Sequence, residues 1–172
     1  MLSKNMVDAL SAQVNAEYYS AYLYLSMSAA AGTAGLKGAA NWLFVQAKEE
    51  TSHGTRIYKY LLERGAAPSF AGIDEPPSSF SSINDIFEKV LAHEQLVSER
   101  INAIATLAMQ ELDHATYQFI LWFVEEQIEE EASVNEILDK LRLLSDSKGS
   151  LFAIDTELGA RVFDDSTQTK AE

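Results

Sequence analysis

The hydrophobic positions of this chain recur at alternating intervals of three and four residues over most of its length. This spacing puts the apolar side chains on one stripe of an α-helix and is typical of helices that pack side by side. Four long stretches and one short stretch follow the pattern, which predicts helices over about 3–31, 36–64, 82–111, 113–144 and 150–162. No stretch has the period of two that a half-buried strand requires, so we expect an all-α protein.

Turn-forming residues separate the predicted helices. Gly65 follows the second helix, and all three prolines fall between residues 68 and 77, outside every helical stretch. Ser82 and Asp85 have the spacing of a capping box at the start of the third helix, and Asp113 is placed to cap the fourth. The last residues are polar. We therefore expect a single domain of residues 1–163 and a frayed tail of residues 164–172.

The lengths of the connections predict how the helices are arranged. Short turns join the first helix to the second and the third to the fourth, so each pair forms an antiparallel hairpin. The sixteen residues 66–81 between the hairpins reach ~53 Å at ~3.3 Å per residue, whereas a helix of about 28 residues is ~42 Å long. We therefore expect a four-helix bundle with one long crossover, plus a short fifth helix. A linker between two separate hairpins is the alternative, but neither hairpin could bury its apolar stripe alone.

Each of the four long helices has one acidic residue in the middle of its apolar stripe: Glu17, Glu50, Glu94 and Glu130. A carboxylate at a core position is strongly destabilising unless a cation compensates it. His53 lies one turn beyond Glu50 on the same helix face, and carboxylates with imidazole are ligands for iron, manganese or zinc. We expect Glu50 to bridge two metal ions. The alternatives are a buried polar network, or acids that reach solvent.

Two neighbours of these acids are further candidates. Tyr24 lies two turns after Glu17 on the same face, where it could hydrogen-bond a ligand carboxylate, give up an electron, or simply fill the core. Gln127, one turn before Glu130, could orient a ligand or bound oxygen, or support a ligand, and we count it among the candidate catalytic and metal-binding residues. His93 and His114 fall outside the stripes, and we interpret both as surface residues.

A second acidic group lies beside the first. Glu126, Glu129 and Glu130 form one ridge of the fourth helix, and Glu49 points off the second helix at a neighbouring angle. Like charges on a ridge repel one another. The ridge is therefore either a solvated face or a further cation site, and spacing alone favours the solvated face.

The composition narrows the function further. The chain has 172 residues, of which 47% are hydrophobic, so it is long enough and apolar enough to build one core. It has no cysteine, which excludes disulfides, zinc fingers and iron–sulfur clusters within it. A net charge of −13 argues against nucleic acid as a partner and is compatible with attracting cations. We see neither a signal peptide nor a membrane-spanning stretch, and we expect a cytoplasmic protein with no membrane partner.

Three stretches of the chain resemble bacterial non-haem ferritins: residues 46–53, 93–96 and 119–131, together with the tyrosine-rich first helix. The resemblance covers essentially the whole chain, and it implies a ferritin-like fold. It also implies an iron-storage ferroxidase, which oxidises Fe(II) with O2 at a di-iron centre. The ferric ions would be stored as a hydrated oxide inside a hollow homo-oligomeric shell of about 24 copies, and an unknown reductant would release them.

The resemblance also assigns residues to sites. Glu17, Glu50 and His53 match the first iron site, and Glu94 and Glu130, with the shared Glu50, match the second. The ridge matches a third iron site of the bacterial non-haem branch, formed by Glu49, Glu126, Glu129 and Glu130. Tyr24 matches a tyrosine beside the iron centre. This likeness changes our interpretation of the ridge from a solvated face to a functional site.

Two departures from the haem-containing relative, bacterioferritin, predict that no haem is bound. Bacterioferritin has a second Glu-x-x-His pair on its fourth helix, where this chain has Gln127 and Glu130. It also has a haem-ligating methionine directly after the first-motif glutamate, where this chain has Thr51. Two other functions use a similar scaffold. One is a small di-iron oxidase or peroxidase like rubrerythrin, and the other is a purely structural helical assembly.

Overall fold

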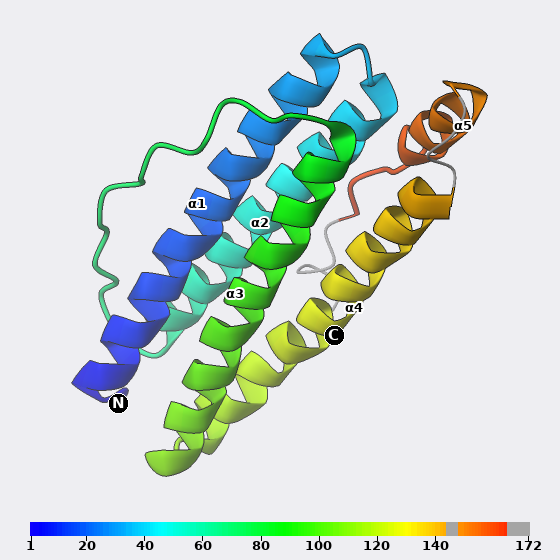
Figure 1. Cartoon of the computed structure of the whole chain (residues 1–172). Helices are drawn as coiled ribbons and strands as arrows, with labels where there is room; N and C mark the ends of the chain where they lie inside the picture. The colour runs from blue at the N-terminus through cyan, green and yellow to red at the C-terminus, as the bar shows by residue number, and fades with distance from the viewer. Residues whose placement is uncertain (144–147, 165–172) are drawn as a thin grey trace.

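The computed structural model describes residues 1–143 and 148–164, and it contains five helices in this part of the chain (Figure 1). They are α1 (Lys4–Thr33), α2 (Lys37–Glu63), α3 (Ile83–Gln110), α4 (His114–Leu143) and α5 (Lys148–Leu158). The described residues contain no strand, so the all-α prediction is confirmed. Apart from residue 164, the predicted tail lies outside the described residues.

Tight turns build the two predicted hairpins. Gly35, with φ of 86°, lies in the turn between α1 and α2, and Leu112, with φ of 55°, lies between α3 and α4. A positive φ is easy for glycine but uncommon for leucine, because the side chain crowds the backbone there. In both hairpins the chain reverses within a few residues, so the paired helices are antiparallel.

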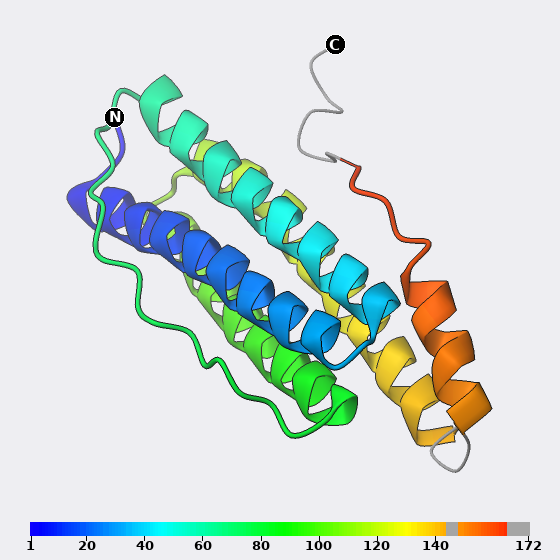
Figure 2. The ribbon, with the colours of Figure 1, turned by 90° about the horizontal axis from the view of Figure 1, so that it is seen from above.

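The long crossover runs along the outside of α1 (Figures 1 and 2). Ser11 accepts a hydrogen bond from the backbone N–H of Ser69 at 3.2 Å. Farther along α1, Asn15 donates to the carbonyl of residue 72 at 3.3 Å, and Ser26 donates to that of residue 77 at 2.6 Å. The crossover therefore follows α1 from end to end and brings α3 in parallel to α2. The alternative of two separate hairpins is wrong, because all four long helices form one bundle.

The predicted capping box at the start of α3 is half correct. The Ser82 hydroxyl accepts from the backbone N–H of Asp85 at 3.1 Å, as expected. The Asp85 carboxylate, however, accepts from the N–H of Ser81 at 2.8 Å and not from that of Ser82. Asp113 accepts from the N–H of Thr116 at 3.2 Å, which confirms it as the cap of α4.

The first turn of α2 is capped by another helix. Leu36 offers it no side-chain cap. Asp155 of α5 accepts instead from the backbone N–H of Ala39 at 2.9 Å. The two helices can come this close because Gly38 has no side chain: a Cβ there would lie 1.5 Å from the carbonyl oxygen of Asp155. Docking α5 on α2 therefore satisfies a backbone donor that would otherwise lack a partner.

The last helix ends earlier than the sequence predicts. It stops at Leu158, whereas the prediction extended it to about residue 162. Asn41 of α2 donates from its side-chain amide to the carbonyl oxygens of Gly159 and Arg161, at 3.3 and 2.9 Å. These contacts hold the following residues along α2, so they leave the helix axis.

The hydrophobic core has two parts. One part includes Tyr24, Met27, Leu43, Phe87, Val134 and Leu141. The other includes Leu10, Val14, Ile57, Ile101, Ile120 and Phe123. The buried polar side chains between them, along the four long helices, include Glu17, Ser20, Glu50, His53, Glu94, Gln127 and Glu130. A polar layer thus crosses the middle of the bundle.

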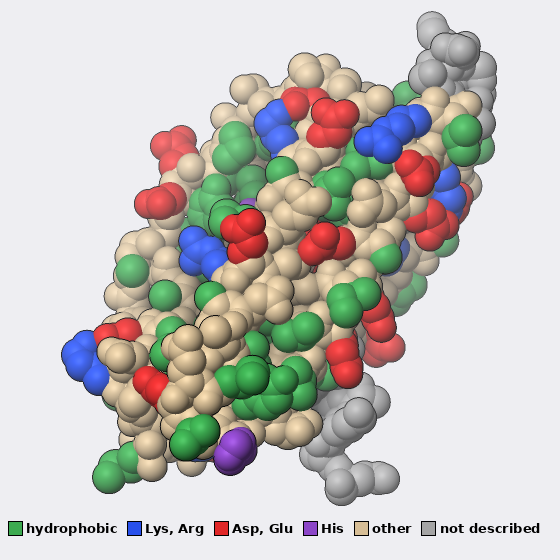
Figure 3. Space-filling model, turned by 60° about the horizontal axis from the view of Figure 1, so that its bottom comes forward, with side chains coloured by type: hydrophobic (Ala, Val, Ile, Leu, Met, Phe, Trp, Pro, Cys, Tyr) green, Lys and Arg blue, Asp and Glu red, His purple; other side chains and the backbone are tan. Residues whose placement is uncertain are grey.

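The surface matches the acidic composition. Acidic side chains are spread over the face in Figure 3, and the fewer basic ones are dispersed among them. This face has no continuous basic patch of the kind that binds nucleic acid. Among the described residues, no helix combines the length and apolar character that a membrane span needs.

Candidate metal centre

The five residues at the centre of the polar layer are almost completely shielded from solvent. The exposed fractions are 1% for Glu17, 2% for Glu50, 3% for His53, 1% for Glu94 and 8% for Glu130. Each of the four long helices contributes at least one of them. The alternative in which these acids turn outward to solvent is therefore wrong.

Three of the residues converge on one point. Glu17, Glu50 and His53 each offer a ligand atom, and these three atoms all lie within 4.8 Å of one another. The distance from Glu50 Oε2 to His53 Nδ1 is 3.8 Å, too long for a hydrogen bond. Two donors that each lie ~2.1 Å from one ion are roughly 3 to 4 Å apart, so the spacing of Glu50 and His53 suits a shared cation.

One oxygen in this group has no partner. Glu17 Oε2 is the only buried side-chain nitrogen or oxygen without a hydrogen bond in the described part of the chain. An unsatisfied buried acceptor is destabilising by roughly 1–3 kcal/mol, and more when it is charged. A bound cation would satisfy it, as would a proton shared with the neighbouring carboxyl of Glu50. The residues present therefore fit a metal ion.

Amide side chains orient the two glutamates of this group. Gln13 donates to Glu17 Oε1 at 2.9 Å, and Gln46 donates to Glu50 Oε1 at 3.0 Å. In both cases the amide lies four residues before the carboxylate on the same helix, and it leaves the other oxygen free to bind a cation. The sequence analysis missed both glutamines, although their spacing from the two acids was visible.

Glu94 is held differently from the other acids. The Tyr24 hydroxyl donates to Glu94 Oε1, and Gln127 Nε2 donates to Glu94 Oε2 at 3.0 Å. Tyr24 therefore contacts a candidate ligand directly, which was one of the options that the sequence left open. Gln127 presents its nitrogen to Glu94 and supports that side chain.

The predicted ligands of the second ion do not form a similar cluster. Within the described residues, Glu17, Glu50 and His53 are the one group of donors that converges so closely. Glu94 and Glu130 interact with Glu50 electrostatically, and this interaction contributes to the raised pKa of Glu50. Glu94 stays apart because two hydrogen bonds occupy both of its oxygens.

Burial makes these acids hard to ionise. It raises the pKa of Glu17 to about 8, with a further contribution from Glu50. Burial followed by the charge of Glu130 raises the pKa of Glu94 to about 7, and burial raises that of Glu50 well above its ordinary value. The metal-free centre therefore holds protons that cations would displace on binding.

The acidic ridge is only partly solvated. Glu49 and Glu126 are half-buried, whereas Glu129 is exposed. Glu126 Oε2 lies 3.9 Å from His53 Nε2, so the ridge is next to the buried cluster. Burial raises the pKa of Glu49 to about 7. Glu49 also forms an ion pair with Arg161, from the segment after α5.

The interpretation of His93 as a surface residue is wrong. Its Nε2 lies 2.7 Å from the Ser20 hydroxyl of α1, and its ring lies against Tyr19 and Tyr24. Burial lowers the pKa of His93 to about 4. The apolar stripe of α3 marks only the residues that face the bundle centre. His93 lies on the side of α3 that faces α1, so the stripe does not show that it is packed against another helix. His114 is exposed, as expected.

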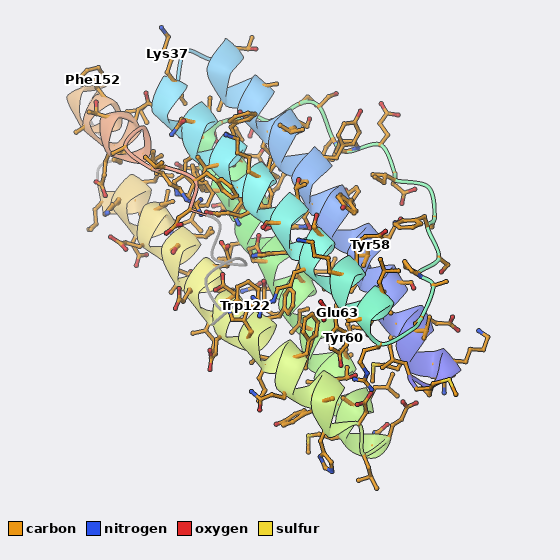
Figure 4. All side chains as sticks on the ribbon, turned by 180° about the vertical axis from the view of Figure 1, so that it is seen from behind. Lys37, Tyr58, Tyr60, Glu63, Trp122 and Phe152 are labelled. Carbon is orange, nitrogen blue, oxygen red and sulfur yellow. The ribbon has the colours of Figure 1, made fainter. Side chains whose placement is uncertain are left out.

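Aromatic side chains close one side of the buried cluster. Trp122 projects from α4 toward α2 (Figure 4). Its ring and that of Phe123 meet the His53 ring edge-on, with centroids 5.5 and 5.8 Å away. The guanidinium of Arg56 lies 3.8 Å above the Trp122 ring. These contacts fix the plane of the imidazole and limit the access of water to it.

The bundle and its buried layer together define a class of protein, the helical bundles that bind metal ions through carboxylates and imidazole from facing helices. A family model for the ferritin-like domain matches residues 7–144. This chain belongs to the ferritin family.

Relatives and solved structures confirm the resemblance. Bacterial non-heme ferritin of Staphylococcus aureus strain USA300 is 40% identical over 165 residues, covering 96% of this chain and 99% of that protein. The namesake from Staphylococcus saprophyticus is 42% identical over 166 residues, with the same two shares. The open-pore ferritin of the archaeon Archaeoglobus fulgidus superposes with a TM-score of 0.92 and 46% identity, covering 94% of this chain and 98% of that one. An engineered closed form of that ferritin gives 0.93 and 45%, covering 95% and 100%.

Proposed function

We propose that this protein stores iron and oxidises Fe(II) with O2 at the buried centre. The observation that carries the proposal is the orphaned Glu17 Oε2, which lies beside Glu50 and His53 in a dry layer. Family membership supports iron as the metal, and carboxylates with imidazole suit it chemically. We also propose that residues 1–163 form a single domain.

The residues would divide the work as follows. Glu17, Glu50 and His53 hold the first Fe(II), and Glu50, Glu94 and Glu130 hold the second. Tyr24 and Gln127 orient Glu94 by donating hydrogen bonds to its two oxygens. At least one of these hydrogen bonds must break for Glu94 to bind the metal. Iron supplies the electrons that reduce O2, and the carboxylates release their protons as the cations enter.

A third iron site would use Glu49, Glu126, Glu129 and Glu130. Support comes from the partial burial of Glu49 and Glu126 and from the closeness of Glu126 to His53. Oxidised iron would be stored as a mineral inside a homo-oligomeric shell of about 24 copies, in keeping with the closed symmetry common among oligomers. Release of the iron would need an external reductant.

The absence of haem stays a prediction. Thr51 has a hydroxyl that donates to the carbonyl of Ala47 at 2.9 Å, and it offers no soft ligand of the kind that methionine provides. Gln127 and Glu130 stand where bacterioferritin has its second Glu-x-x-His pair. Protein supplied with haem should show no Soret absorbance after purification, and a stoichiometric Soret band would contradict this.

Stopped-flow oxidation of Fe(II), with O2 consumption recorded, tests the proposed activity. Glu50→Gln should abolish the rapid phase, because it removes the ligand shared by both ions. Glu125→Gln is the matched control, since Glu125 is an exposed acid of α4 outside the centre. Rapid oxidation by Glu50→Gln at the wild-type rate would contradict the site assignment.

Size-exclusion chromatography separates the proposal from its rivals. A large shell that turns over iron supports storage. A dimer that oxidises iron supports the smaller oxidase or peroxidase, and an assembly that neither binds nor oxidises iron supports a purely structural role.

A further inference from the structure

We propose that Arg161 is a built-in competitor for the third metal site. Its guanidinium forms an ion pair with Glu49, and a cation that binds Glu49 must displace it. The third site would therefore hold iron weakly and pass it on. This inference rests on the proposed third site.

Three side chains of α2 hold the guanidinium of Arg161. One of its nitrogens pairs with Glu49 Oε2, and another donates to Gln46 Oε1 at 2.7 Å. The centre of the guanidinium lies 4.3 Å from the ring centroid of Trp42. The side chain therefore has a defined seat at the edge of the buried layer, and the ion pair is only partly screened by water.

The backbone around Arg161 is anchored separately from its side chain. Asn41 donates to the carbonyl oxygens of Gly159 and Arg161, and α5 is docked through Asp155. The guanidinium could therefore leave Glu49 while the segment stays on α2. Release of the side chain does not require α5 to undock.

The position of the charge explains why Arg161 should weaken the site. Glu49 and Glu126 are half-buried acids, and a divalent cation between them would lie close to the guanidinium. Two cations that share one carboxylate repel each other, most strongly where water is scarce. Arg56 is a second cation near Glu126, but its guanidinium is stacked on Trp122.

Arg161 also connects the third site to the buried centre. Because Gln46 Oε1 accepts from Arg161, the amide nitrogen of Gln46 is turned toward Glu50 Oε1. Glu50 is the ligand proposed to bridge both ions of the centre. Displacement of Arg161 would loosen this orientation, so occupancy of the third site would be felt at the bridge.

Anaerobic calorimetric titration of the assembled protein with Fe(II) tests the proposal. Wild type should show two tight binding events and a weaker third one. Arg161→Gln should tighten the third event about tenfold, or ~1.4 kcal/mol, and should change the first two by less, because it reaches Glu50 only through Gln46. Arg161→Lys should fall in between, because it keeps the charge without the planar fork. Arg142→Gln, which changes an exposed arginine of α4, should behave like wild type.

Fluorescence of Trp42 gives a second readout that does not depend on oxidation. In a Trp122→Phe background, Zn²⁺ should change Trp42 emission as the guanidinium leaves the ring. The same change should already be present in Arg161→Gln before metal is added. If Zn²⁺ fills the third site and Trp42 emission does not respond, the guanidinium stays in place and the proposal is wrong.

Two outcomes distinguish a failure of this inference from a failure of the proposed third site on which it rests. If wild type lacks a third event that Glu49→Gln removes, the third site itself is wrong and the inference falls with it. If that event is present and Arg161→Gln leaves it unchanged or weakens it, the site stands. Arg161 is then only a clamp that holds the last segment on α2.

Discussion

Glu17 combines a buried carboxyl, a hydrogen bond to one oxygen and nothing on the other. Because its pKa is raised to about 8 in the folded protein, the folded state binds this proton more tightly than the unfolded chain does. The resulting stabilisation is complete below the unfolded pKa of 4.5 and is lost as the pH rises through about 8. Glu17, a proposed metal ligand, therefore lowers the stability of metal-free protein at high pH.

We expect the free energy of unfolding of metal-free protein to fall by a few kcal/mol between pH 5 and pH 9. Glu17→Gln should reduce this fall, because glutamine has no proton to lose. Urea denaturation at several pH values measures both. Glu125→Gln should keep the wild-type slope, and a stability that rises with pH in the wild type would contradict the prediction.

Tyr24→Phe probes the support of Glu94. It removes the hydroxyl that donates to Glu94 Oε1 and leaves a buried acceptor unsatisfied, so metal-free protein should lose about 1–3 kcal/mol of stability. Tyr22→Phe is the control, because Tyr22 is 53% exposed, and its effect should stay within ~0.5 kcal/mol. Equal denaturation midpoints for the two variants would show that the hydroxyl does not stabilise Glu94.

Whether the role of a residue could be predicted depends on whether its partners lie in the same helix or in another one. A charged side chain inside an apolar stripe is visible in the sequence, so Glu17, Glu50, Glu94 and Glu130 were correctly placed in the buried layer. The hydrogen bond of His93 to Ser20 joins two helices, and no spacing within one helix reveals it. Arg161 lies far along the chain from Glu49, and only the docking of α5 brings the two together.

At the level of helices, local signals predicted what local interactions determine. Apolar periodicity gave the four long helices, and Ser82 and Asp113 marked the starts of two of them. The start of α2 and the end of α5 depend on each other instead. Asp155 caps α2, and Asn41 draws the chain away after Leu158. Neither contact has a counterpart in the sequence pattern.

Gly38→Ala tests this mutual dependence. The new methyl group would overlap the carbonyl of Asp155, so α5 must move away from α2, at a loss of roughly 1–3 kcal/mol. Trp42 emission should change as well, because Arg161 would leave with the segment. Gly72→Ala is the control, since a Cβ there meets nothing within 4 Å. An unchanged melting temperature and emission in Gly38→Ala would contradict the close docking.

For the protein as a unit, bound cations should contribute directly to stability. A ligand that binds only the folded state adds about 2.7 kcal/mol per site at a free concentration of 100 times its Kd. Anaerobic Zn²⁺ should therefore raise the melting temperature of metal-free protein. The gain should be strongly reduced in a Glu17→Ala, His53→Ala double variant, measured by calorimetry. An equal gain in the double variant would place the stabilising ion elsewhere.

The division of the core into two apolar parts has a consequence for motion. Helices usually fray at their ends and are most protected in the middle. In metal-free protein, like-charged groups meet in the middle of this bundle, whereas apolar packing stabilises both of its ends. Opening fluctuations should therefore begin in the middle of the bundle, and backbone amides around Glu50 should exchange with heavy water sooner than those near Leu10 or Leu141. Metal ions bound at the centre would suppress this local opening.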